Sequence, residues 1–346
     1  MKKVFNLICL VFFGVSVYAQ EVSLVTSGEG KTKYEATAAA LRSAIEQSFG
    51  TFVSANTTIL NEDVVRDEIA TVASGNIKSY KEISCVRRAD GIYNVSVDAV
   101  VSIGKLISYA KSHGSSAEFA GQTFAMEVKM YELNRKNEYE ALKNLLVQLK
   151  SLRNDLFDYV IKVNNPRRRH FDETYNIDVI IGIATNQNYM TFFDILMNTL
   201  NSLSIKEDEL ALMHKIDIHR VTKFGFNNND FYKFRNSSVL INAFAKEVCT
   251  ILNEAQMSFY VQENGGNDSR TIKDTAIRRF HTIDVIGNIL MVLQQKPGIE
   301  YTDEPGRIII ENKKYISAPI ITYNYTVERL YGVKGFEVKK KPIADK

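Results

Sequence analysis

The sequence predicts an α/β (α+β) protein with a small N-terminal β-α-α-β-β module, a second mixed α/β region and a β-rich C-terminal part. Segments with apolar residues at every second position alternate with segments that repeat them every three or four positions, as strands and helices do. A length of 346 residues also favours more than one domain, at roughly 100 to 200 residues each. We expect a leader at 1–19, the first module at 20–112 and the second region at 118–346, with its β-rich end from about 297.

The first twenty residues have the pattern of an export signal. Lys2 and Lys3 precede an almost unbroken apolar run, Val4 to Val17, and Ala19 supplies a small residue at the expected cleavage position. A membrane span needs about 20 apolar residues, and this run stops before Gln20. We therefore expect cleavage after Ala19 and an exported protein, periplasmic or associated with the envelope, without a transmembrane span.

The first module begins with a strand and a helix. Val22 and Leu24 alternate with polar residues, and Gly28-Glu29-Gly30 is expected to end the strand and turn the chain. Thr32 and Glu35 then form a capping box at the start of a helix. The expected buried stripe of this helix is Tyr34, Ala38, Leu41, Ala44, Ile45 and Phe49.

A second helix and two strands complete the module. Asn61 and Gly75 bound the expected helix, and the segments Ile77 to Arg87 and Ile92 to Val101 flank a turn at 88–91. One face of the last strand is apolar, and we expect the helices to cover it: Tyr93, Val95, Val97, Ala99 and Val101. The opposite face carries Asn94, Ser96 and Asp98. We expect this polar face to be open and to accept a partner, by side-chain contacts or by strand addition at the sheet edge.

The second region follows a linker at 113–116 and alternates strands with helices. Strands are expected at 124–133, 156–163, 177–184 and 257–262, with further strands in 307–338. Helices are expected at 138–152, 189–203 and 238–253.

The first module resembles the N-terminal domain of flagellar assembly protein T and a related family of small bacterial surface lipoproteins, over residues 22 to about 102. The resemblance is carried by Ser27-Gly28-Glu29-Gly30, Glu35-Ala36, Ala44-Ile45-Glu46-Gln47, Ser74-Gly75, Ile77-Lys78-Ser79-Tyr80 and Asp90-Gly91-Ile92-Tyr93-Asn94-Val95. It implies an exported envelope module that packs helices on a small sheet and helps to assemble or stabilise a larger structure. It implies no catalytic residues.

The sequence contains no motif that predicts a reaction. A phosphate loop at Gly28–Thr32 would need a glycine where Val25 stands, and the serines form no Gly-x-Ser-x-Gly elbow. His214 and His219 are five residues apart, a spacing that shares no helix face and points to opposite sides of a strand. The net charge of +3 gives no global field for nucleic acid or an anionic membrane. We therefore expect no enzyme, no cofactor, no bound metal and no nucleic-acid partner.

Three weaker signals each allow two interpretations. Arg167, Arg168 and Arg169 form the densest basic cluster, which could hold a phosphate, an anionic glycan or an acidic partner, or could be a solvated loop. Tyr323 and Tyr325 could line a groove or belong to the core. The cysteines at 85 and 249 could form one bridge, although two separate buried thiols are favoured.

The export pattern, the resemblance and the missing catalytic motifs together predict a non-catalytic protein of the cell envelope or periplasm. It would act as an assembly or interaction module on one or more envelope proteins. The alternative is an envelope enzyme or a ligand-binding protein with its site in residues 118–346.

Overall fold

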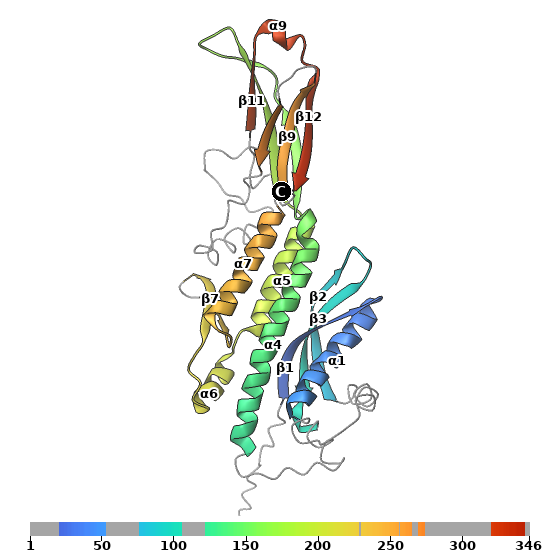
Figure 1. Ribbon diagram of the computed structural model, residues 1–346, viewed down its shortest axis with the longest axis vertical. Helices are drawn as coiled ribbons and strands as arrows, with labels where there is room; N and C mark the ends of the chain where they lie inside the picture. Colours follow the sequence, from blue (N-terminus) through green and yellow to red (C-terminus); the bar gives the residue numbers. More distant parts are fainter. Residues whose placement is uncertain are drawn as a thin grey trace, which may run out of the picture.

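The computed structural model describes residues 21–52, 76–105, 122–227, 230–255, 257–264, 269–273 and 320–342. It confirms an α+β fold, with helices and small antiparallel sheets. The molecule is elongated: three helices run along its long axis, strands from two sheets extend beyond them, and the N-terminal sheet lies against the lower half (Figure 1). The expected leader, the helix at 61–75, the linker at 113–116 and the segment 274–319 lie outside the described residues.

The N-terminal sheet is antiparallel and has one helix packed on its apolar face. Its strands β1 (Glu21–Gly30), β2 (Ile77–Arg87) and β3 (Tyr93–Ser102) are ordered β1-β3-β2, and helix α1 (Lys33–Phe52) lies between β1 and β2 in sequence. The predicted turn is confirmed: the Gly91 N–H donates to the Arg88 carbonyl at 2.9 Å, and Gly91 has φ of +84°. The predicted apolar face of β3 is also confirmed, because the side chains of Val95, Val97, Ala99 and Val101 are all buried against α1 and β1.

Helix α1 packs unusually close to strand β1. A Cβ added to Gly28 would lie 2.2 Å from the Ala40 nitrogen and 2.3 Å from the Ala36 carbonyl oxygen. The buried face of α1 accordingly consists of small residues at four-residue spacing, Ala36, Ala40, Ala44 and Ser48, together with Ile45. Gly28 thus permits close approach of two backbones, and the expectation that Gly28 and Gly30 turn the chain is wrong because both belong to β1.

Two expectations for α1 have different outcomes. The Thr32 cap is confirmed, because the Glu35 N–H donates to Thr32 Oγ1 at 3.1 Å. The reciprocal bond is shifted by one residue, because the Glu35 carboxylate accepts from the Lys31 N–H at 2.9 Å, where a capping box uses the N–H of Thr32. The predicted stripe is wrong at Tyr34 and Ala38, which are exposed. The close contact with Gly28 requires small side chains on the face of α1 that contains Ala36 and Ala40, and Tyr34 and Ala38 lie outside this face.

A single helix, α4 (Gln122–Leu152), spans both segments: it confirms the helix expected at 138–152 and shows that the strand expected at 124–133 is wrong. Its first half contacts two different clusters. Met126, Met130 and Leu133 pack against the N-terminal sheet, while Val128 and Tyr131 pack against Met213 and its neighbours. Burial on two faces places apolar residues at nearly every second position, which imitates the pattern of a strand.

Helix α4 also covers the polar face of the N-terminal sheet. Gln148 Nε2 donates to Asn94 Oδ1 at 2.7 Å and to Ser96 Oγ at 2.9 Å, and its Oε1 accepts from Ser84 Oγ at 2.7 Å. Asn94 and Ser96 are each only 4% exposed. Asp98 is half-buried and accepts a hydrogen bond from Ser23 Oγ. The expectation of an open polar face is therefore wrong for Asn94 and Ser96, because Gln148 of α4, which is 54 and 52 residues away from them along the chain, covers this face.

The second region combines helices with two facing sheets and a two-stranded antiparallel sheet, β7-β8. After a 3-10 turn, Arg153–Asp155, its elements are β4 (Phe157–Val163), β5 (Arg167–Arg168), β6 (Tyr175–Thr185), α5 (Gln187–Leu203), α6 (Glu207–Lys215), β7 (Thr222–Asn227), β8 (Asp230–Phe234), α7 (Ser238–Glu254), β9 (Met257–Asn264), β10 (Ser269–Lys273), β11 (Ile320–Tyr325), α9 (Val327–Leu330) and β12 (Gly335–Pro342). Helices α5 and α7 and strands β4, β6 and β9 fall within three residues of their expected bounds.

The two sheets have the orders β11-β6-β4 and β10-β9-β12, with β5 paired to β6. Aromatic contacts join them: Tyr159 lies 5.0 Å from Phe259 and Tyr323 lies 4.9 Å from Phe336, between ring centroids. The expected β-rich C-terminal part thus contributes one strand to each sheet. The core of the helices continues into the core of both sheets as one cluster.

The close packing at Gly28 gives a first prediction. Gly28→Ala should lower the free energy of unfolding by about 3 kcal/mol, because the added methyl group overlaps backbone atoms of α1 that no rotamer change can move. The matched control is Gly50→Ala, where a Cβ meets nothing within 4 Å and helix propensity favours alanine. Chemical denaturation of both variants measures the difference; equal stabilities would contradict the close approach.

The covered polar face gives a second prediction. Ser96→Arg should lower the free energy of unfolding by about 3 kcal/mol or more, because it places an unpaired charge beneath Gln148. Ser79→Arg makes the same change at an exposed position of β2 and should alter stability by less than about 0.5 kcal/mol. Thermal and urea denaturation distinguish them, and a fully stable Ser96→Arg variant would show that α4 does not cover this face.

Candidate interaction surface at the distal tip

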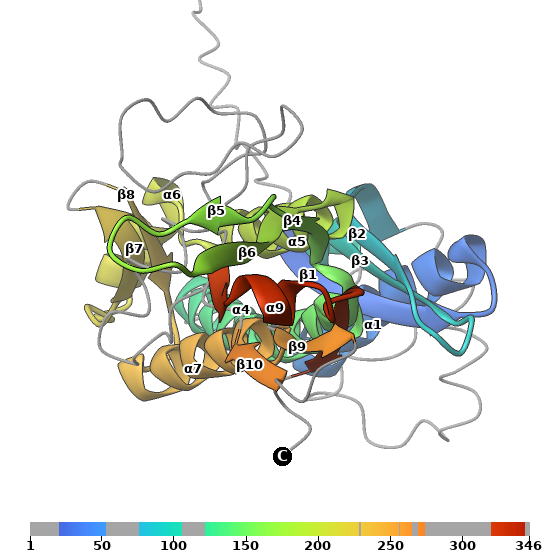
Figure 2. The same ribbon diagram turned by 90° about the horizontal axis from the view of Figure 1, so that it is seen from above.

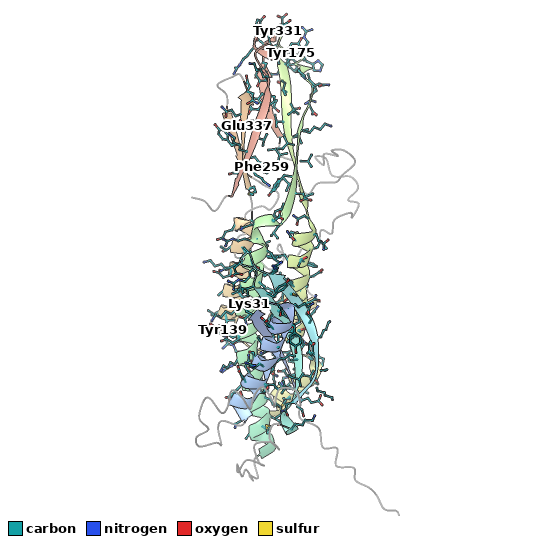
Figure 3. All side chains as sticks on the ribbon, turned by 90° about the vertical axis from the view of Figure 1, so that its right-hand side faces the viewer. Lys31, Tyr139, Tyr175, Phe259, Tyr331 and Glu337 are labelled. Atoms are coloured by element: carbon teal, nitrogen blue, oxygen red, sulfur yellow. The ribbon has the colours of Figure 1, made fainter. Side chains whose placement is uncertain are left out.

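Two turns project from the end of the molecule that is farthest from the N-terminal sheet. One comprises residues 167–174, which lead from β5 into β6, and the other comprises residues 326–334 around α9; together we call them the distal tip. Tyr175 on β6 pairs with both Arg168 and Tyr325, which places both turns at the same end of one sheet. Figure 2 shows the two turns from above, and Figure 3 shows Tyr175 and Tyr331 at the top of the molecule, far above Lys31 and Tyr139 near its middle.

The turn between β5 and β6 is held by its own hydrogen bonds. The Arg169 N–H donates to the Thr174 carbonyl at 2.9 Å, and the Thr174 N–H donates to Asp172 Oδ1 at 3.2 Å. The Thr174 hydroxyl also donates to Asp172 and lowers the pKa of that carboxyl group below its usual value. Phe171 stands at the apex of this ordered turn and is 97% exposed.

The second turn packs two apolar side chains against the core of the sheets and exposes an aromatic side chain to solvent. Thr326 caps α9 by accepting from the Arg329 N–H at 3.4 Å, and Leu330 and Val333 pack against the core of the two sheets. Tyr331 points the other way and is 91% exposed. Among the exposed large hydrophobic residues of the described ranges, Phe171 and Tyr331 are the most exposed.

The three arginines of the expected basic cluster have different surroundings. Arg167 pairs with Asp178, a nearly buried carboxylate that also accepts from Thr322 Oγ1 at 2.7 Å. Arg169 pairs with Asp172 at 3.1 Å. Arg168 is exposed and forms no ion pair with the described residues. The cluster therefore does not present three free guanidinium groups on one surface, and Arg168 is its available member.

The tyrosines of β11 belong to the core. Tyr323 and Tyr325 are each 1% exposed, and their hydroxyl groups donate to the Val261 carbonyl at 3.1 Å and to Glu263 Oε2 at 2.7 Å. Burial, chiefly, raises the pKa of Tyr325 well above its usual value. The alternative of a tyrosine-lined groove is wrong, because both rings fill the space between the two sheets.

The described ranges hold few side chains that could act as a nucleophile, a general base or a metal ligand. Cys85 and Cys249 are separate thiols, as expected, but Cys85 is half-buried and not buried. Burial raises the pKa of Cys249 to about 12. The carboxylate of Glu138 is fully buried and accepts from the N–H groups of Arg235 and Asn236.

No group of three or more His, Cys, Asp or Glu side chains in the described part could hold a metal ion. None of the described helices is long and apolar enough to cross a membrane.

Sequence reasoning named the arginines of the distal tip but missed its aromatic residues. Phe171 was detectable as a single aromatic residue within a polar run, Arg167 to Thr174. Tyr331 gave no such signal, because it follows Leu330 in a segment rich in apolar residues. Comparison with protein-family models, curated proteins and solved structures finds no match for this chain.

Proposed function

We propose that this chain is an exported, non-catalytic protein of the cell envelope that acts as an interaction or assembly module and holds a protein partner at its distal tip. The observation that carries the proposal is the exposure of Phe171 and Tyr331 at the same end of an elongated body. Exposure of two aromatic side chains to water is unfavourable. A partner that covers them removes their apolar surface from water, which stabilises the complex.

The composition of the distal tip favours a protein over an anionic partner. The two turns carry five basic residues, Arg167, Arg168, Arg169, Arg329 and Lys334, and three acidic ones, Asp172, Glu173 and Glu328. Asp178 and Glu263, which lie outside the turns, pair with Arg167 and Arg329, so basic and acidic side chains at the tip are equal in number. A surface of balanced charge attracts nucleic acid or anionic lipid only weakly. Aromatic residues and arginine are the types enriched at the centres of protein interfaces, and Phe171, Tyr331 and Arg168 supply them.

The tip can hold a partner in a fixed position because its support is stiff. The Tyr323 and Tyr325 hydroxyl groups connect β11 to β9 across the two sheets. At the junction with the helices, Asn186 Nδ2 donates to the Asp155 carbonyl at 3.0 Å, and Arg153 pairs with Glu254 at 2.7 Å. Little conformational entropy remains to be lost when the tip binds.

Export and the absence of catalysis are supported by the sequence more than by the fold. The N-terminal basic and apolar pattern predicts a leader, and the resemblance of residues 22 to about 102 implies an envelope module. The buried Cys249 thiol, with its raised pKa, is a poor nucleophile. Glu138 has all its acceptor capacity engaged by Arg235 and Asn236, which suits a structural role.

A photo-crosslinking experiment tests the proposal. A photoreactive phenylalanine analogue at position 171 or 331 of the full chain, expressed in its own cells, should cross-link one envelope polypeptide. The same analogue at Tyr34, which is 83% exposed on α1, is the matched control and should not give that product. The double variant Phe171→Ser with Tyr331→Ser should reduce co-purification of the cross-linked polypeptide about tenfold or more, since each buried aromatic anchor contributes about 1.5 kcal/mol or more.

The folding of these variants needs its own measurement. Both replaced side chains are exposed, so the double variant should melt within about 2 °C of the parent chain, consistent with a change below about 0.5 kcal/mol. Equal cross-linking from positions 34, 171 and 331, or full co-purification by a folded double variant, would sink the proposal.

A further inference from the structure

Two histidine rings lie next to each other in the structure, although their spacing of five residues predicts that they point in different directions on a helix or a strand. His214 Nδ1 and His219 Nδ1 lie 3.0 Å from each other, and His219 Nε2 lies 2.9 Å from Asp217 Oδ1. Both rings are exposed, at the end of α6 and in the segment that follows it. From these contacts we propose a binding site for a late first-row divalent metal ion, with the two Nδ1 atoms as its protein ligands.

A reversal of the backbone creates this arrangement. The Ile218 N–H donates to the Met213 carbonyl at 2.8 Å and the Asp217 N–H donates to the His214 carbonyl at 3.1 Å, which is a Schellman motif ending α6. Met213 and Ile218 pack together in the cluster that also contains Tyr131 of α4. This apolar contact fixes the reversal, so His219 folds back over the last turn of α6 instead of continuing away from it.

Asp217 occupies a position where glycine is favoured. Its φ is +60°, and it is the one non-glycine residue with positive φ in the described ranges. Glycine adopts this conformation at lower cost, but glycine has no carboxylate to accept the Nε2–H of His219. Backbone strain at such a position is commonly associated with a functional constraint. The hydrogen bond to His219 supplies a reason for the aspartate.

The hydrogen-bond roles are those of a metal ligand with a supporting carboxylate. When His219 donates its Nε2–H to Asp217, its Nδ1 carries a lone pair. Ring nitrogens that bind metal usually have their other N–H held by a carboxylate in this way. Without metal, His214 must donate its Nδ1–H to His219. With metal, His214 adopts the other neutral tautomer, its proton moving to Nε2 through solvent, so that both Nδ1 atoms face the ion.

The separation of the two nitrogens fits such an ion. With metal–nitrogen bonds of about 2.0 to 2.1 Å, two ligands lie about 2.9 Å apart at a right angle and about 3.4 Å apart at a tetrahedral angle. The observed 3.0 Å lies within this range. Imidazole ligands favour Zn²⁺, Ni²⁺ and Cu²⁺ over Mg²⁺ or Ca²⁺. Water would complete the coordination, because no group of three or more His, Cys, Asp or Glu side chains in the described ranges could hold the ion.

Titration of the untagged mature chain with ZnCl₂ and with NiCl₂, followed by calorimetry, tests the site. We expect one ion per chain. His214→Ala and His219→Ala should each weaken binding at least tenfold, because each removes one of two ligands. His170→Ala is the matched control, since His170 is also exposed but lies in the distal tip; it should bind the ions as the parent chain does.

Asp217→Gly separates a positioning role from a structural one. Glycine relieves the backbone at positive φ, so the melting temperature of this variant should stay the same or rise. Loss of the carboxylate should nevertheless weaken metal binding about tenfold, the lower end of the range for supporting carboxylates. If Asp217→Gly binds as tightly as the parent chain, Asp217 only shapes the turn. If neither ion binds at 1 mM, or binding survives both histidine variants, the metal site is refuted.

Discussion

The buried carboxylate of Glu138 is the interaction on which the arrangement of the second region depends. It is 0% exposed and accepts four hydrogen bonds, two from Arg235 and two from Asn236. Burial of a carboxylate costs several kcal/mol unless its oxygens are satisfied, and here they are, with Glu209 holding the other side of Arg235. The connection from β8 to α7 is thereby fixed on α4, and with it the direction in which α7 enters β9.

The neighbouring residue of α4 performs the equivalent task for the N-terminal sheet. Asn137 accepts from the Val25 N–H at 3.0 Å and donates to the Val25 carbonyl at 2.9 Å, so its amide satisfies the outer edge of β1. Consecutive helix residues point about 100° apart, which lets Asn137 and Glu138 serve two different partners. Gln148 lies eleven residues later, about three turns on, and meets the same sheet again. One helix therefore sets the orientation of both halves.

These polar contacts explain which parts of the fold could be predicted from the sequence. Helices α5 and α7 bury one face each, and strand β3 carries apolar residues on one face only, so their periodicity is clear and their bounds are predicted closely. Helix α4 buries two faces, and the apolar spacing of its first half therefore predicts a strand where a helix forms. The polar face of β3 read as solvent-exposed because nothing near Ser96 in sequence reveals Gln148. Likewise, the small residues of α1 do not by themselves predict which face is buried, because this depends on their contact with Gly28. The failures at α4 and at Ser96 concern contacts between segments far apart in the chain, whereas the one at α1 concerns the close approach of two consecutive elements.

The paired charges of the distal tip determine how a partner would be recognised there. Because Arg167 and Arg169 are neutralised within the protein, long-range attraction would add little to the rate of association. Affinity would come from covering Phe171 and Tyr331, a short-range contribution that chiefly slows dissociation. Such contacts require the two turns to keep their positions, and they do so through a core that runs unbroken from α4 to β11. The buried side chains Asn137, Glu138 and Gln148 therefore bear on the tip as well, since they hold the helix from which that core is built.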